Sequence, residues 1–75
     1  MLLEDVQITD GSPLVGLTVG KARRSYMPDV NVLAVKTRDG VILNPDAGVA
    51  LDKGDALAVI GTATQLAALE QATAR

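Results

Sequence analysis

The residues of this chain with the most evident capacity for chemistry are carboxylates and guanidinium groups. Asp39, Asp52 and Asp55 occur within one short stretch and could serve as paired carboxylates for acid–base chemistry or for binding a metal ion. Arg23 and Arg24 are adjacent, and a guanidinium group matches the oxygens of a phosphate in bidentate fashion. The sequence therefore raises an acidic candidate site and a basic one.

Glycines beside the acids favour a structural role for the carboxylates. Asp39 precedes Gly40, Asp55 follows Gly54, and the side chain of Asp in such turns bonds local N–H groups. We therefore predict that these acids, Asp52 included, shape turns and do no chemistry. For the two arginines, two interpretations stay open: a clamp on an anionic ligand, or a solvated pair at the negative pole of a helix.

Several classes of function are excluded by residues that the chain lacks. It has no His and no Cys, which removes the usual zinc ligands and the Ser-His and Cys-His nucleophile pairs, so we predict that it is not an enzyme. A net charge of -2 and a single aromatic residue, Tyr26, argue against binding to nucleic acid. No apolar run approaches a membrane span and no signal peptide begins the chain, so we expect no direct membrane insertion and a cytoplasmic location.

The length of 75 residues fits a single domain, 1–75, with an aliphatic core. Such a small core gives a thin margin of stability, which favours a homo-oligomer or a fragment of something larger. Periodicity and turn signals predict an α+β domain of order β-α-β-β-β-α, with a mixed or antiparallel sheet and helices packed on it. The expected strands are 2–9, 30–37, 41–44 and 56–60, and the expected helices are 18–24 and the segment that Thr62 and Gln65 open as a capping box.

Segments of this chain match a known family in order and spacing. They are "GLTV" at 16–19, "VNVLAVKTRDG" at 30–40, "NP" at 44–45 and "LDKGDALAVIG" at 51–61, followed by the closing helix. With these segments the chain resembles the TrkA C-terminal domain, also called the RCK C-terminal domain, over nearly its whole length. The Leu-x-x-Gly-Asp-x-Leu-x-Val-x-Gly run from Leu51 to Gly61 is the most specific part.

The resemblance implies a cytosolic regulatory domain of prokaryotic potassium channels and transporters. It implies a homodimer, a partner that is a channel or transporter subunit or a fused Rossmann domain, and a ligand at the dimer interface such as cyclic di-AMP or another nucleotide. No Gly-x-Gly-x-x-Gly follows a strand, so no dinucleotide cofactor site is expected in this chain itself. The leading hypothesis is a ligand-sensing domain that controls potassium or other cation transport, and the alternative is a purely structural dimerisation domain without a ligand.

The resemblance also indicates the ligand-binding residues. Asn31 and Val32 match the pair that contacts the base, Val19 and Pro45 match an apolar patch, and Arg24 is the candidate for the phosphate-binding cation. The family's Arg aligns onto Ser25, which leaves open whether Arg23, Arg24 or Ser25 fills that position. Asn31 could instead satisfy a neighbouring backbone group, and Pro45 could simply end a strand. Tyr26 could stack on a ligand base or cover the dimer seam.

Overall fold

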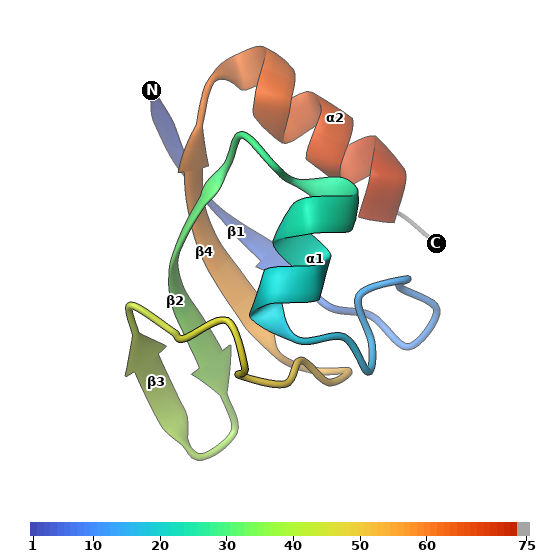
Figure 1. Cartoon of the computed structure of the whole chain (residues 1–75), viewed down its shortest axis with the longest axis vertical. Helices are drawn as coiled ribbons and strands as arrows, with labels where there is room; N and C mark the ends of the chain where they lie inside the picture. The colour runs from blue at the N-terminus through green and yellow to red at the C-terminus, as the bar shows by residue number, and fades with distance from the viewer. Residues whose placement is uncertain (74–75) are drawn as a thin grey trace.

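A four-stranded antiparallel sheet with two helices forms the fold in the computed structural model, which describes residues 1–73 (Figure 1). The strands run in the order β1-β4-β2-β3, and every neighbouring pair is antiparallel. The elements are β1 (Leu2–Gln7), α1 (Val19–Tyr26), β2 (Asn31–Thr37), β3 (Gly40–Leu43), β4 (Ala56–Gly61) and α2 (Ala63–Thr73). The predicted α+β class and the order β-α-β-β-β-α are confirmed.

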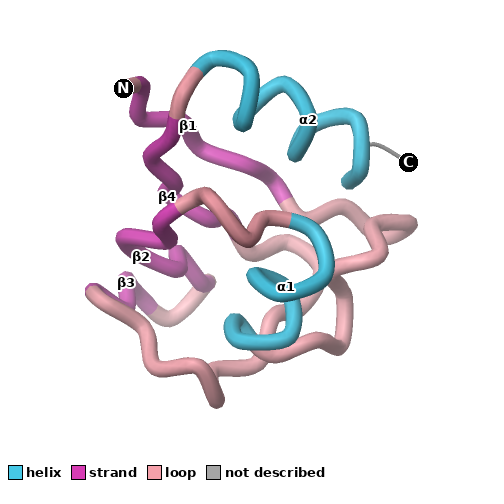
Figure 2. The backbone as a smooth tube through the Cα atoms, turned by 45° about the horizontal axis from the view of Figure 1, so that its top comes forward, coloured by secondary structure: helices cyan, strands magenta, loops and turns pink. Residues whose placement is uncertain are grey.

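Both helices and the long loops cover one face of the sheet, which leaves the other face open (Figure 2). On the covered face Leu57 of β4 lies opposite Val6 of β1 and Val35 of β2, and all three side chains are buried. The core is aliphatic, as predicted from the composition. Its buried members are Val6, Ile8, Leu14, Val19, Ala22, Met27, Val30, Val35, Leu51, Leu57, Val59, Leu66 and Leu69.

The open face carries the side chains that alternate with the core residues along each strand. Lys36 of β2 donates to the carboxylate of Asp5 of β1 at 2.8 Å, so this ion pair crosses β4 on that face. Strand β2 lies between β4 and β3 in the sheet, and its second face is not covered. Asn31 and Leu33 are exposed, and the pairing of β2 with β4 shifts register between Val32 and Ala34.

Helix α1 begins at Val19, directly after a Thr N-cap. The hydroxyl of Thr18 accepts from the amide of Lys21 at 3.3 Å. The helix ends at Tyr26, two residues beyond the predicted end, because Pro28 restricts only the residue directly before it. That residue, Met27, has the non-helical angles φ -149 and ψ 55.

Helix α2 begins with the predicted capping box. The amide of Gln65 donates to the hydroxyl of Thr62 at 3.2 Å, and the amide of Thr62 donates to the side-chain oxygen of Gln65 at 2.9 Å. Leu66 and Leu69 then pack into the core, which holds α2 on the sheet. Within residues 1–73, neither helix is long and apolar enough to cross a membrane.

Candidate functional site

The acids of the last turn are structural. The carboxylate of Asp55 accepts from the amide of Asp52 at 3.1 Å, and Gly54 adopts φ +88, which favours Gly at this position. The amide of Gly54 also donates to the carbonyl of Ile8 at 2.8 Å, so the turn is fastened to the end of β1. Residues 1–73 contain no group of three or more acids, His or Cys that could hold a metal ion. The turn role predicted for Asp52 and Asp55 is confirmed.

The hairpin between β2 and β3 turns at Arg38 and Asp39, between the paired residues Thr37 and Gly40. Within this turn, the backbone amide of Asp39 donates a hydrogen bond to the hydroxyl of Thr37 at 3.2 Å. Gly40 is the residue with positive φ, at +144, while Asp39 keeps a negative φ. The turn predicted at Asp39 and Gly40 is therefore present, and Gly40 supplies its positive φ.

The positive pole of α1 is closed to ligands because its first amides already have acceptors. Val19 donates to the carbonyl of Val49 at 2.8 Å, Gly20 donates to the carbonyl of Ala47 at 2.9 Å, and Lys21 donates to Thr18. Free amides at a helix N-terminus are what would otherwise attract an anion. An anionic ligand of α1 would therefore have to bind its side chains.

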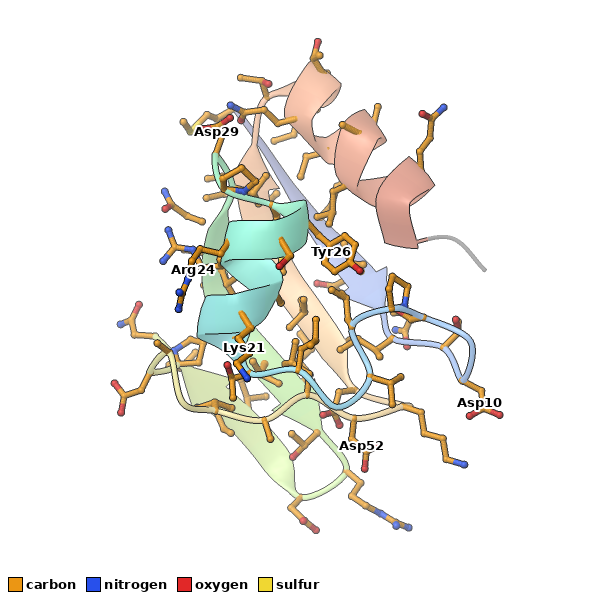
Figure 3. The ribbon with its side chains drawn as sticks, turned by 45° about the vertical axis from the view of Figure 1, so that its right-hand side comes forward. Asp10, Lys21, Arg24, Tyr26, Asp29 and Asp52 are labelled. Carbon is orange, nitrogen blue, oxygen red and sulfur yellow. The ribbon has the colours of Figure 1, made fainter. Side chains whose placement is uncertain are left out.

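Two arginines in the last turn of α1 line a surface hollow of about 330 Å³. The side chains of Arg23 and Arg24 are both exposed, and Arg24 extends from the side of α1 opposite to Tyr26 (Figure 3). The remaining lining residues are Gly20, Pro28 and Ala47. Within residues 1–73 neither arginine forms an ion pair, so both charges remain open to an anion.

A second hollow differs from this one in its balance of charge. It measures about 300 Å³ and is lined by Arg38 and Lys53, but also by Asp52 and Asp55. The two carboxylates offset the two cations, and each of them already accepts a backbone amide. The hollow beside α1 has no acid in its lining, so it is the better candidate for a phosphate.

The predicted ligand-binding residues occupy different environments. Of the five, Arg24 lines the basic hollow, while Asn31 is exposed at the start of β2. Val32 is half-buried against the core, and Pro45 is half-buried two residues beyond the end of β3. Val19 is 3% exposed and belongs to the core, so in this chain its side chain packs α1 against the core. None of the other four residues lines the basic hollow.

Three of the residues that line the basic hollow beside α1 were not predicted from the sequence as part of a site. Gly20 has no side chain, which allows the contact with Ala47. Ala47 itself carries no signal in the sequence, because a small residue in a loop has no distinctive chemistry. Pro28 directly follows Met27, the C-cap residue of α1.

Tyr26 lies in a separate groove between the end of α1 and the start of α2. It is half-buried, and the groove measures about 210 Å³. The lining residues are Tyr26, Met27, Pro28, Asp29, Val30, Thr64, Gln65 and Ala68. The phenol ring therefore packs beside α2 and away from the arginines.

The described residues thus form an antiparallel α+β domain with a basic surface hollow beside α1. The TrkA-C domain family matches residues 3–73. This chain therefore belongs to the TrkA-C domain family. No curated protein matches it in sequence.

Solved structures with the same fold include RCK C-terminal domains. The RCK_C domain dimer of S. agalactiae BusR in complex with c-di-AMP superposes with a TM-score of 0.82 at 14% identity, over 96% of this chain and 95% of that one. The RCK C domain of the potassium transport protein KtrA in complex with c-di-AMP gives a TM-score of 0.76 at 24% identity, over 92% and 79% of the two chains. These likenesses confirm the fold.

Longer proteins contain the same domain. The GsuK channel bound to NAD gives a TM-score of 0.75 at 20% identity, over 93% of this chain and 13% of the channel chain. BusR in complex with its busAB-promotor DNA gives a TM-score of 0.79 at 14% identity, over 92% of this chain and 34% of that one. In both proteins most of the chain lies outside the part that resembles this domain.

Proposed function

We propose that this chain is a ligand-sensing regulatory domain that acts as a homodimer and controls the transport of potassium or another cation. The basic hollow beside α1 carries the proposal, because Arg23 and Arg24 present two exposed guanidinium groups there without acidic partners in residues 1–73. Guanidinium groups suit the phosphates of a nucleotide. Cyclic di-AMP is the first candidate, since the structures of BusR and KtrA with this fold contain it.

The size of the hollow favours a ligand that two copies share. At about 330 Å³ it lies near the lower end of the range for small-molecule sites, roughly 300–1,000 Å³. One hollow is thus suited to one nucleotide half of a cyclic dinucleotide. A twofold axis between two copies would place a second, identical hollow against the other half.

The remaining predicted residues take supporting parts in this proposal. Asn31 is exposed at the start of β2, where its amide can bond a base, and Val32 lies beside it. Pro45 is half-buried after β3 and can form an apolar wall. Val19 acts from the core by fixing the position of α1, which carries Arg24.

Regulation would follow from a difference in affinity. A ligand across the twofold axis favours the arrangement of the two copies that it binds more tightly, and it shifts the equilibrium only by that difference. The arrangement would be transmitted to a channel or transporter subunit or to a fused Rossmann domain, on the cytosolic side of the membrane. In this proposal the domain binds and does not catalyse.

We propose further that this domain makes no contact with nucleic acid. BusR binds promotor DNA, but 34% of that chain corresponds to this one. The charge here is -2, and the neutralisation of a phosphate backbone needs clustered cations. A gel-shift titration with duplex DNA should show no complex, and a complex that weakens with salt would contradict this part.

Calorimetric titration of the chain with cyclic di-AMP, with AMP and NAD as comparisons, tests the main proposal. We expect saturable heat with cyclic di-AMP at one ligand for every two chains, as the shared site requires. Absence of heat with all three ligands, for a chain that is dimeric by sedimentation, would overturn the sensing role. It would favour the alternative of a structural dimerisation domain.

A further inference from the structure

The groove between the end of α1 and the start of α2 differs in size and lining from the basic hollow. Its volume is about 210 Å³. Small-molecule sites measure roughly 300–1,000 Å³, so a nucleotide does not fit in this groove. Met27 and Val30 of its lining belong to the buried core, and Ala68 adds an apolar side chain from α2. The groove therefore suits a single long side chain with an apolar stem.

Asp29 gives the groove a negative charge. It is the one charged residue among those of residues 1–73 that line the groove. Its side chain is exposed and forms neither an ion pair nor a hydrogen bond within that part of the chain, and the hydroxyl of Thr64 has no hydrogen-bond partner there. The groove thus offers two open acceptors and no cation of its own.

The end of α1 adds to this negative potential. The amide of Met27 donates to the carbonyl of Arg23 at 3.1 Å, and the next residue, Pro28, has no N–H to continue the helix. The carbonyls of residues 24–26 accept no backbone N–H from the described residues beyond the helix. Such open carbonyls form the negative pole of a helix, which attracts a cation.

Tyr26 supplies an aromatic surface in the same groove. It is the one aromatic residue of the chain, and it is half-buried. Its ring lies on the side of α1 opposite to Arg24, so the guanidinium group of Arg24 points away from it (Figure 3). Aromatic faces attract guanidinium groups, and the methylene stem of an arginine packs on apolar surface.

We propose that this groove is a docking site for an arginine side chain of a partner protein. The arginine stem packs between Tyr26 of α1 and Ala68 of α2, and the guanidinium group pairs with the carboxylate of Asp29. Arginine suits the groove better than lysine, because its planar fork of donors can bond a carboxylate in bidentate fashion and also reach the hydroxyl of Thr64. A partner protein suits a groove of this size, because it inserts one side chain and leaves its backbone outside.

Docking in this groove does not depend on the ligand of the basic hollow. Pro28 lines both, but neither Arg23 nor Arg24 lines the groove. A chain that does not bind cyclic di-AMP could therefore still bind an arginine. Conversely, loss of arginine binding would leave the nucleotide titration unchanged, so the two proposals can fail separately.

Tyrosine fluorescence tests the docking site directly. The chain has one Tyr and no Trp, so its intrinsic emission comes from Tyr26 in the groove. The probe is Nα-acetyl-arginine amide, which mimics the residue within a protein, and Nα-acetyl-citrulline amide is its uncharged counterpart. We expect a saturable change in emission with the arginine probe and none with citrulline, and NMR amide shifts concentrated in residues 26–30 and 64–68. Absence of saturation, or equal binding of both probes, would overturn the proposal.

Free arginine tests whether the site serves a protein or an amino acid. The capped probe should bind at least as tightly as free arginine, because only the side chain enters the groove. Much tighter binding of free arginine would assign the site to the amino acid and would contradict a protein partner.

Two variants test the named contacts. Asp29→Asn should weaken binding of the arginine probe by about tenfold, as expected for loss of a charge-assisted hydrogen bond. Asp39→Asn removes an equal charge at the hairpin turn, outside the groove, and should bind like the wild type. Tyr26→Leu keeps an apolar side chain but removes the ring, so NMR shifts should show weaker binding. Equal affinity of Asp29→Asn and Asp39→Asn, both with the circular dichroism of the wild type, would overturn the proposal.

Discussion

The amide of Gly20 donates to the carbonyl of Ala47 at 2.9 Å, and this bond joins the first turn of α1 to the loop that follows β3. The two residues touch because Gly20 has no side chain. A Cβ at position 20 would lie 2.9 Å from the Cβ of Ala47 and 3.2 Å from its carbonyl oxygen. The same two residues line the basic hollow, so this contact also sets its shape.

We expect Gly20→Ala to lower the free energy of unfolding by about 1–2 kcal/mol in urea denaturation. Overpacking against backbone atoms costs about 2–3 kcal/mol, the upper part of its usual range, and the better helix propensity of Ala returns about 1 kcal/mol of it. Gly48→Ala in the same loop is the control, since a Cβ there meets no atom within 4 Å. If Gly20→Ala proved as stable as Gly48→Ala, the close contact would not hold α1 in place.

Arg24→Ala should weaken the binding of cyclic di-AMP by about tenfold or more, because a charge-assisted hydrogen bond contributes about 1.5–3 kcal/mol. The free energy of unfolding of the Arg24→Ala variant should differ from that of the wild type by less than about 0.5 kcal/mol, since the side chain of Arg24 is exposed. Arg38→Ala removes an equal charge at the hairpin turn and is the control.

Asn31→Ala should also weaken binding without unfolding the domain. Titration calorimetry with parallel thermal melts measures both effects, and an unchanged affinity in Arg24→Ala would place the phosphate contact elsewhere.

Asp55→Ala should destabilise the fold by about 1 kcal/mol and leave ligand binding unchanged. The substitution removes the acceptor of the Asp52 amide in the turn before β4. Asp46→Ala, at an exposed loop residue, is the matched loss of charge. Denaturation midpoints measure the stability, and calorimetry measures the ligand binding. A loss of binding with stability retained would indicate that Asp55 takes part in the ligand site.

Glu4 and Glu70 form the one titrating pair for which the sign of a pH effect follows from the described structure. A side-chain hydrogen bond with Glu70, desolvation and the like charge raise the pKa of Glu4 above its ordinary value of 4.5. The folded state thus holds a proton more tightly than the unfolded state. The resulting stabilisation is present below the unfolded pKa and is lost as pH rises through the folded pKa.

Glu4→Gln should therefore raise the melting temperature at neutral pH, where the like charges oppose each other. The gain should shrink as pH falls through the raised pKa of Glu4 and should be lost below 4.5, where wild-type Glu4 is protonated as well. Asp39→Asn, at an exposed turn residue, controls for the change in net charge. Thermal melts between acid and neutral pH test this, and an equal gain at every pH would show that Glu4 and Glu70 do not interact.

Local chemistry allowed much of this fold to be predicted. The capping box of Thr62 and Gln65, the N-cap of Thr18 and the glycine turns depend on residues within a few positions of each other, and the structure contains each of them. The family motif extends the same information over residues 3–73. The order of strands and helices was therefore predictable without knowledge of long-range contacts.

Tertiary contacts decided the rest. Whether β2 was covered on both faces depended on where the helices pack, and β3 became a free edge only through the strand order β1-β4-β2-β3. The basic hollow needed Ala47 beside Gly20, residues far apart in sequence and without a distinctive pattern. Val19 has the residue type of an apolar ligand contact, yet packing placed it in the core. Residue type and spacing determine local conformation, while the exposure of a side chain depends on every element that packs around it.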